Sequence, residues 1–157
     1  MSIDFNADEV FEIAEQIERN GAKFYRTTAE KIVDEDKRKL LLNLAKMEDE
    51  HEQTFKQLRS ELTRDEKVMT TFDPEGDSEA YLKYLADTRV FYEKETDTTS
   101  FKEILKSAIT AEKDSIVFYL GIKDVVPVHL GKQKLDGIIK EEMNHIRLLS
   151  KELLELR

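Results

Sequence analysis

Apolar residues recur along most of the chain at spacings of three and four, which is the period of an amphipathic α-helix. One such stripe covers residues 7–32. Asn6 precedes it, and Asn6 and Glu9 are spaced as in a capping box. A second stripe covers residues 35–62 and follows Asp34, a residue type that favours helix N-termini. The pattern therefore predicts two successive long helices.

The second half of the chain repeats this plan. Ser100 and Glu103 form another capping-box pattern, and the stripe that follows covers residues 101–126 until Pro127 stops it. After a turn at residues 127–131, a last stripe continues to the C-terminus. Helices of about 24 to 28 residues are typical of an antiparallel bundle.

Residues 63–99 differ in composition from the rest of the chain. They are rich in Thr and Asp and contain Pro74 and Gly76, while the stretch after Asp77 predicts one short amphipathic helix. Its aromatic and apolar residues either cap one end of the bundle or form a subunit interface; they are Tyr81, Tyr84, Leu85, Phe91 and Tyr92. A crossover of this length places the second and third long helices parallel. We therefore expect a single all-α domain over residues 1–157, an antiparallel four-helix bundle with a long crossover.

Composition narrows the functional classes. The 157 residues include 25 Lys and Arg against 34 Asp and Glu, a net charge of -9, and no Cys. Without Cys, the chain has no disulfide, iron–sulfur cluster, thiolate zinc site or cysteine nucleophile. The acidic balance disfavours nucleic acid and membrane surfaces as partners. Because neither a basic leader nor a long apolar run is present, we expect a cytoplasmic protein.

An internal repeat relates the two helix pairs at an offset of 94 residues. Apolar positions of two amphipathic pairs match by chance, but matching polar residues within apolar stripes are harder to explain that way. The repeat pairs Ala14 with Ala108, Glu18 with Glu112, Phe24 with Phe118, Tyr25 with Tyr119, Leu41 with Leu135, Lys46 with Lys140, Glu48 with Glu142, and His51 with His145.

Four of these repeated residues are glutamates that interrupt core-facing columns. Read by sevens, the columns are Phe11-Glu18-Tyr25-Ile32, Leu41-Glu48-Phe55-Leu62, Leu105-Glu112-Tyr119-Val126 and Leu135-Glu142-Leu149-Leu156. His51 and His145 lie three residues beyond Glu48 and Glu142, and so share a helix face with them. We expect the four carboxylates and two imidazoles to meet at one level of the core.

Four unpaired carboxylates in a core are strongly unfavourable, because each buried charge costs several kcal/mol and like charges force proton uptake. Two divalent ions would balance their charge, and carboxylates with imidazoles suit iron or manganese. The alternative interpretation places these residues on a solvated face. The apolar columns around them argue against it.

The combined stretches resemble a known family. IERNGAKFY (17–25), LAKMEDEH (44–51), AEKDSIVFY (111–119) and IKEEMNH (139–145) are together similar to the ferritin-like di-iron carboxylate proteins, and within them to the rubrerythrin-like branch. The resemblance covers all four long helices. It implies two iron ions, with Glu18 and Glu112 as terminal ligands, Glu48 and Glu142 as bridging ligands, and His51 and His145 each completing one metal.

The chain departs from this resemblance in two respects. Rubrerythrins typically carry an additional Glu one turn after the ligand of the third helix, where this chain has Ser115. The cysteine-bearing rubredoxin domain is also lacking. Both departures argue against a peroxidase activity of the rubrerythrin type.

Four further polar residues lie outside the set of six predicted ligands. We interpret Tyr25 and Tyr119 as core aromatics with satisfied hydroxyls; the alternative is that they hydrogen-bond a carboxylate that lies behind the ligands or supply an electron. Glu141 points about 100° away from its neighbour on the helix, so we expect a solvated side chain, the alternative being a spare ligand. We expect His129 to be an exposed loop histidine.

The resemblance implies a di-iron oxidoreductase of the peroxidase or ferroxidase type that reduces O2 or hydrogen peroxide and is recycled by an external electron-donor protein. Alternatives are a ferroxidase subunit for iron storage, a di-manganese protein, and a bundle with structural metals. We also expect a homodimer or a higher homo-oligomer.

Overall fold

The computed structural model describes residues 6–65, 100–123, 126–130 and 132–156. The long helices in these ranges are α1 (Ala7–Ala29), α2 (Glu35–Ser60), α5 (Phe101–Ile122) and α6 (Gln133–Glu155), and a 3₁₀ turn, η1 (Val128–Leu130), precedes α6. No strand occurs within them. The prediction of an all-α four-helix bundle is confirmed. The short helix predicted after Asp77 lies outside the described residues.

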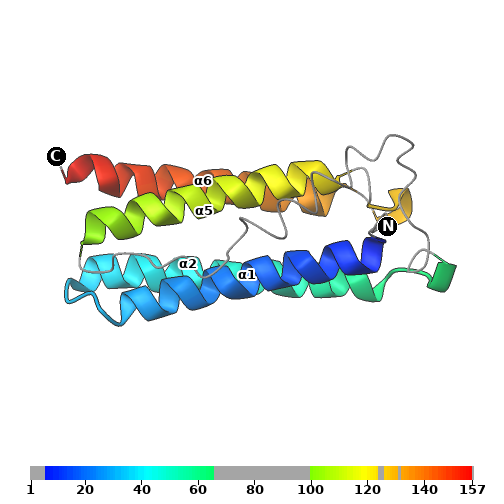
Figure 1. Ribbon diagram of the computed structural model, residues 1–157, viewed down its shortest axis with the longest axis horizontal. Coiled ribbons are helices and arrows are strands. Elements are labelled where there is room, and N and C mark those ends of the chain that lie inside the picture. Colours follow the sequence, from blue (N-terminus) through cyan, green and yellow to red (C-terminus); the bar gives the residue numbers. More distant parts are fainter. Residues whose placement is uncertain (1–5, 66–99, 124–125, 131, 157) are drawn as a thin grey trace, which may run out of the picture.

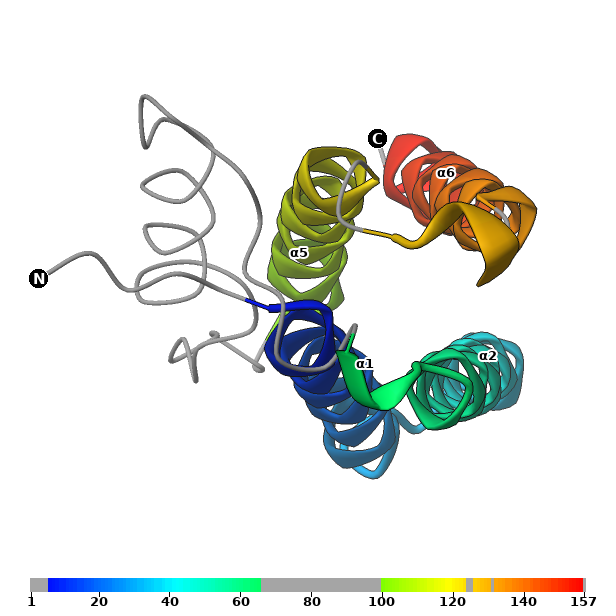
Figure 2. The ribbon, with the colours of Figure 1, turned by 90° about the vertical axis from the view of Figure 1, so that its right-hand side faces the viewer.

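The helices form two antiparallel pairs. Figure 1 shows α1 and α2 running in opposite directions, and α5 and α6 doing the same beside them. In the end-on view of Figure 2, α1 lies next to α2 and α5, while α2 and α5 occupy diagonal corners. Since α2 and α5 run in the same direction, the crossover gives the parallel relationship that the sequence predicts.

The predicted caps open three of the four helices. Asn6 accepts a hydrogen bond from the backbone N–H of Glu9 at 2.9 Å, and the Glu9 carboxylate accepts one from the N–H of Asn6 at 3.2 Å. Asp34 accepts from the N–H of Lys37 at 3.1 Å. Ser100 caps α5 by accepting from the N–H of Glu103. These bonds satisfy amide groups that a helix start leaves without partners.

Three helices end earlier than the sequence predicts. α1 ends at Ala29 rather than Ile32, because the chain tightens into i→i+3 bonds such as that from the N–H of Ile32 to the carbonyl of Ala29. α2 likewise ends at Ser60 rather than at residue 62. α5 ends at Ile122, whereas the sequence predicts residue 126. Residue 126 precedes Pro127, and a proline disfavours the helical conformation of the residue before it.

Two apolar clusters fill the bundle, one toward each end. The first contains Phe11, Phe55, Phe118 and Leu135, and the second contains Leu41, Leu44, Leu105 and Leu149. Each cluster draws residues from all four helices. The polar residues of the predicted site lie between the two clusters in sequence along every helix.

Ion pairs add to the contact between α1 and α2. Arg59 of α2 donates to Glu15 of α1 at 2.8 Å and to Asp8 at 2.8 Å, while Arg19 of α1 lies 2.7 Å from Glu52 of α2. Glu15 and Glu52 are buried, so their arginines compensate charges that would otherwise be costly.

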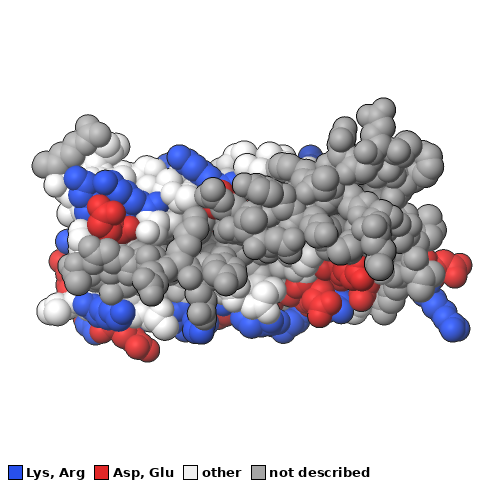
Figure 3. Space-filling view, in the orientation of Figure 1, with Lys and Arg blue, Asp and Glu red and all other residues white. Residues whose placement is uncertain are grey.

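On the face seen in Figure 3, described side chains of both signs intermingle along the edge formed by α1 and α2. None of the helices in the described ranges has the length and apolarity needed to cross a membrane.

Candidate metal centre

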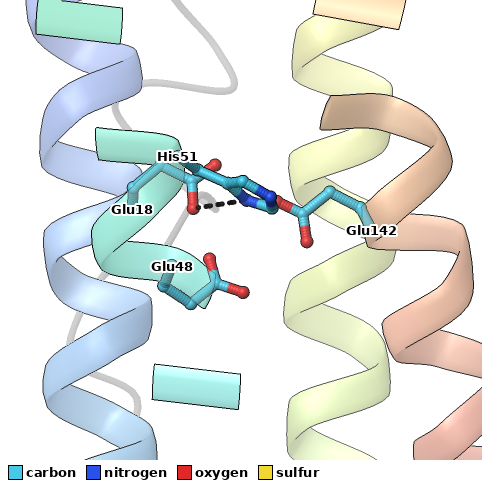
Figure 4. Close-up of side chains that lie close together, drawn as sticks. All are labelled: Glu18, Glu48, His51 and Glu142. Carbon is cyan, nitrogen blue, oxygen red and sulfur yellow. Dashed lines mark hydrogen bonds and ion pairs between the residues drawn. The ribbon is translucent and has the colours of Figure 1, made fainter. Parts of the chain in front are cut away.

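The six predicted ligands meet in one buried cluster in the middle of the bundle. Every one of them is at most 3% exposed: Glu18, Glu48, His51, Glu112, Glu142 and His145. Figure 4 shows part of the cluster, with His51 between Glu18 of α1 and Glu142 of α6, and Glu48 directed toward the same space. The expectation that the carboxylates point inward at one level is met.

Within this cluster, two groups of four residues have ligand atoms that all lie within 4.8 Å of one another. One group contains Glu18 and His51, and the other contains Glu112 and His145. Both groups include Glu48 and Glu142. Each group could surround one cation, and the two shared carboxylates lie where a bridge between two cations would be needed.

The two histidines present the same nitrogen to the carboxylates. His51 Nδ1 lies 3.0 Å from Glu142 Oε1 and 3.5 Å from Glu18 Oε2. The repeat produces nearly the same distances on the other side, where His145 Nδ1 lies 3.1 Å from Glu48 and 3.4 Å from Glu112. The rings stack with centroids 5.7 Å apart. Nδ1 is therefore the nitrogen available to a metal in both halves.

Two tyrosines hold one carboxylate each from the opposite helix pair. The hydroxyl of Tyr25 donates to Glu112 Oε1 at 2.5 Å, and the hydroxyl of Tyr119 donates to Glu18 Oε1. Both tyrosines are buried. Their hydroxyls are satisfied, as the sequence interpretation expects, but the partners are Glu112 and Glu18, two of the predicted ligands themselves, which neither interpretation named.

The cluster fits a cation because it contains acceptor atoms that the described residues leave without a hydrogen-bond donor. Those atoms are Glu18 Oε2, Glu48 Oε1, Glu112 Oε2 and Glu142 Oε2, together with both ring nitrogens of His145. Buried polar atoms rarely lack partners, and a bound ion is among the usual reasons for such a group of atoms. Carboxylate oxygens with imidazole nitrogens suit iron or manganese.

The charges of the metal-free cluster perturb its protonation. Burial and the neighbouring carboxylates Glu112 and Glu18 raise the pKa of Glu48 and of Glu142 well above the usual value. Burial lowers the pKa of His51, but the nearby carboxylates of Glu18 and Glu141 outweigh it and raise that pKa to about 9. The cluster without metal therefore retains protons at neutral pH.

The same balance operates at the other histidine. Burial lowers the pKa of His145, while Glu112 and Glu142 raise it to about 9. Burial also favours the neutral form of Glu112, but His145, whose Nδ1 lies 3.4 Å from this carboxylate, prevails and lowers its pKa.

Glu141 contacts the cluster in a way that the helical pattern does not reveal. Its side chain is 54% exposed, in agreement with the expected solvated position, yet its Oε2 lies 2.5 Å from Nε2 of His51. It touches the ring from the side opposite to Nδ1. A carboxylate at this position fixes the ring and its tautomer when the other nitrogen ligates a metal.

Two other residues agree with their sequence interpretations. Ser115 is buried and donates its hydroxyl to the Ala111 carbonyl at 2.9 Å, so no further carboxylate occupies this position beside Glu112. His129 is exposed in η1, away from the cluster.

Comparisons with known proteins agree with this geometry. A family profile described as Rubrerythrin matches residues 3–59. A crystal structure from Thermotoga maritima, described as that of a ferritin-like diiron-carboxylate protein, is similar over 98% of both chains, with 25% sequence identity and a TM-score of 0.75. No curated protein matches the chain.

Proposed function

We propose that this ferritin-like, rubrerythrin-like protein binds two iron ions at the buried cluster and reduces O2 or hydrogen peroxide there. The observation that carries the proposal is the pair of overlapping four-residue groups that share Glu48 and Glu142. Four carboxylates with a combined charge of about -4 match two divalent ions, and the donor set suits iron or manganese.

The residues divide into three roles under this proposal. Glu18 and Glu112 each have one oxygen held by a tyrosine of the opposite helix pair, which leaves the other oxygen for a metal. Glu48 and Glu142 lie between the two metal positions, and each histidine offers Nδ1. When bound, a pair of ferrous ions supplies the two electrons that reduce hydrogen peroxide to water.

Aromatic side chains border the cluster on both sides along the bundle. Phe55 packs against Tyr119 with ring centroids 5.1 Å apart, and Tyr25 belongs to the apolar cluster on the other side. The tyrosine hydroxyls keep their protons, since burial and the nearby carboxylates raise the pKa of both. An external donor protein would return the electrons after each turnover.

The experiment compares the iron-loaded protein with Glu18→Ala and with Glu12→Ala, whose side chain is exposed on the same helix. We expect Glu18→Ala to lose oxidation of ferrous iron and consumption of peroxide, and Glu12→Ala to retain both. Equal rates in all three proteins would contradict the proposal. Mineral cores in large closed assemblies would favour iron storage, and activity with manganese alone would favour the di-manganese alternative.

A further inference from the structure

A groove of about 490 Å³ lies between α2 and α6 and reaches the ring of His51. Polar and charged side chains of both helices line it, among them Glu50, Gln53 and Thr54 of α2 and Lys134 and Glu141 of α6, so that two carboxylates of the lining face one lysine. Behind His51 lies Glu142, whose Oε1 is 3.0 Å from Nδ1 of His51 and whose Oε2 is 2.9 Å from Nδ1 of His145. The groove therefore joins the surface to one side of the cluster.

Gly137 contributes open space to this groove. It is the fifth residue of α6, where glycine is less favourable for the helix than alanine. A Cβ at this position would meet no atom within 4 Å, so close packing does not require the glycine. Its effect is to leave the groove wide at that point.

The internal repeat provides a comparison within the same chain. At the offset of 94, the positions that correspond to Gly137, Glu141 and Thr54 hold larger or less polar residues, namely Asn43, Met47 and Leu148. The distances between histidines and carboxylates are nearly the same in the two halves of the cluster, but the residues around the two histidines differ. Gly137, Glu141 and Thr54 occur on the side of His51.

We propose that this groove is the route by which a divalent metal ion reaches the cluster, with Glu50 and Glu141 as the carboxylates that attract the ion. The inference rests on the proposed function, because it presupposes metal sites inside. Both carboxylates are exposed, and they approach the groove from different helices. Glu141 also contacts His51, the predicted ligand closest to the groove.

The test is the rate at which metal-free protein takes up Co²⁺, followed by the visible absorption of the bound ion. Gly137→Leu fills the groove, and we expect uptake at least about tenfold slower, with an unchanged final number of ions. Asn43→Leu is the matched control at the repeat-equivalent position, which is exposed on α2, and should take up Co²⁺ at the wild-type rate.

A second pair of variants keeps the test decisive. Thr54→Leu introduces the residue that the other repeat has at this position. We expect it to slow Co²⁺ uptake, and it provides an independent test if Gly137→Leu does not fold. Glu50→Gln with Glu141→Gln should slow uptake most at low salt, because screening weakens attraction between exposed charges. Wild-type rates in the folded groove variants, with normal stoichiometry, would overturn the route alone. Failure of the wild-type protein to bind Co²⁺ would overturn the proposed function as well.

Discussion

Tyr25 of α1 donates its hydroxyl to Glu112 of α5 at 2.5 Å, across the boundary between the two helix pairs. The repeat places Tyr119 in the same relationship to Glu18. Each helix pair thus supplies one of these two carboxylates and the hydroxyl that positions the carboxylate of the other pair. Together with the contacts of His51 to Glu142 and of His145 to Glu48, these two bonds link the halves of the bundle.

Tyr25→Phe should lower the free energy of unfolding of the metal-free protein by about 2 kcal/mol, because a buried charged acceptor loses its donor. Urea denaturation measures the change. Thr28→Val is the control, since it removes a buried hydroxyl of the same helix that bonds only backbone carbonyls. A Tyr25→Phe protein as stable as the wild type would show that this bond does not hold the pairs together.

Much of this arrangement was predictable from the residues. Asn6 and Asp34 predict helix N-termini because their side chains accept hydrogen bonds from nearby backbone amides. The core-facing columns that contain Glu18 and Glu48 follow from helical periodicity alone. The partners of Tyr25 were not predictable in this way, since its hydroxyl reaches a residue 87 positions away on another helix.

The surroundings of Glu141 were also only partly predictable from the sequence. Its position on the helix surface correctly predicts an exposed side chain, but its contact with His51 depends on how far α6 is rotated against α2. Periodicity within one helix does not contain that rotation. The groove beside Glu141 is hidden in the sequence for the same reason, although the replacement of Met47 by Glu141 across the repeat hints at it.

The stability of the metal-free protein should fall as the pH rises from about 6.5 to about 9. His51 and His145 bind a proton up to about pH 9 in the folded state but only to about 6.5 in the unfolded chain. Over this interval the folded state binds more protons, so the free energy of unfolding decreases with pH. Thermal denaturation in chelator at several pH values measures it. A midpoint that rises over this range would contradict the protonated cluster.

Metal removal at neutral pH should lower the melting temperature. A ligand that binds only the folded state, at a free concentration of about 1,000 times its Kd, stabilises it by about 4 kcal/mol. The chelated protein also retains buried glutamates whose burial is unfavourable. Scanning calorimetry with and without chelator tests this, with re-addition of metal as the control. An unchanged melting temperature would argue against buried metal.

Arg59→Met should destabilise the protein by about 1–3 kcal/mol, because Glu15 then keeps a buried charge without its partner. Arg26→Met is the matched control, because Arg26 pairs with Asp49 and both side chains are more than 40% exposed. Loss of this exposed ion pair should lower the free energy of unfolding by less than about 1 kcal/mol. Urea midpoints of the two variants measure the difference. Equal losses would mean that burial of Glu15 adds nothing to the pair.

Six residues of one chain are proposed to hold two metal ions. Anaerobic titration of the metal-free protein with ferrous iron, followed by native mass spectrometry, counts the ions on each chain. We expect two ions for the wild type and for Glu12→Ala, and one for Glu18→Ala and for Glu112→Ala. A wild-type chain that binds no iron or one ion, or a Glu18→Ala or Glu112→Ala chain that still binds two, would contradict this proposal.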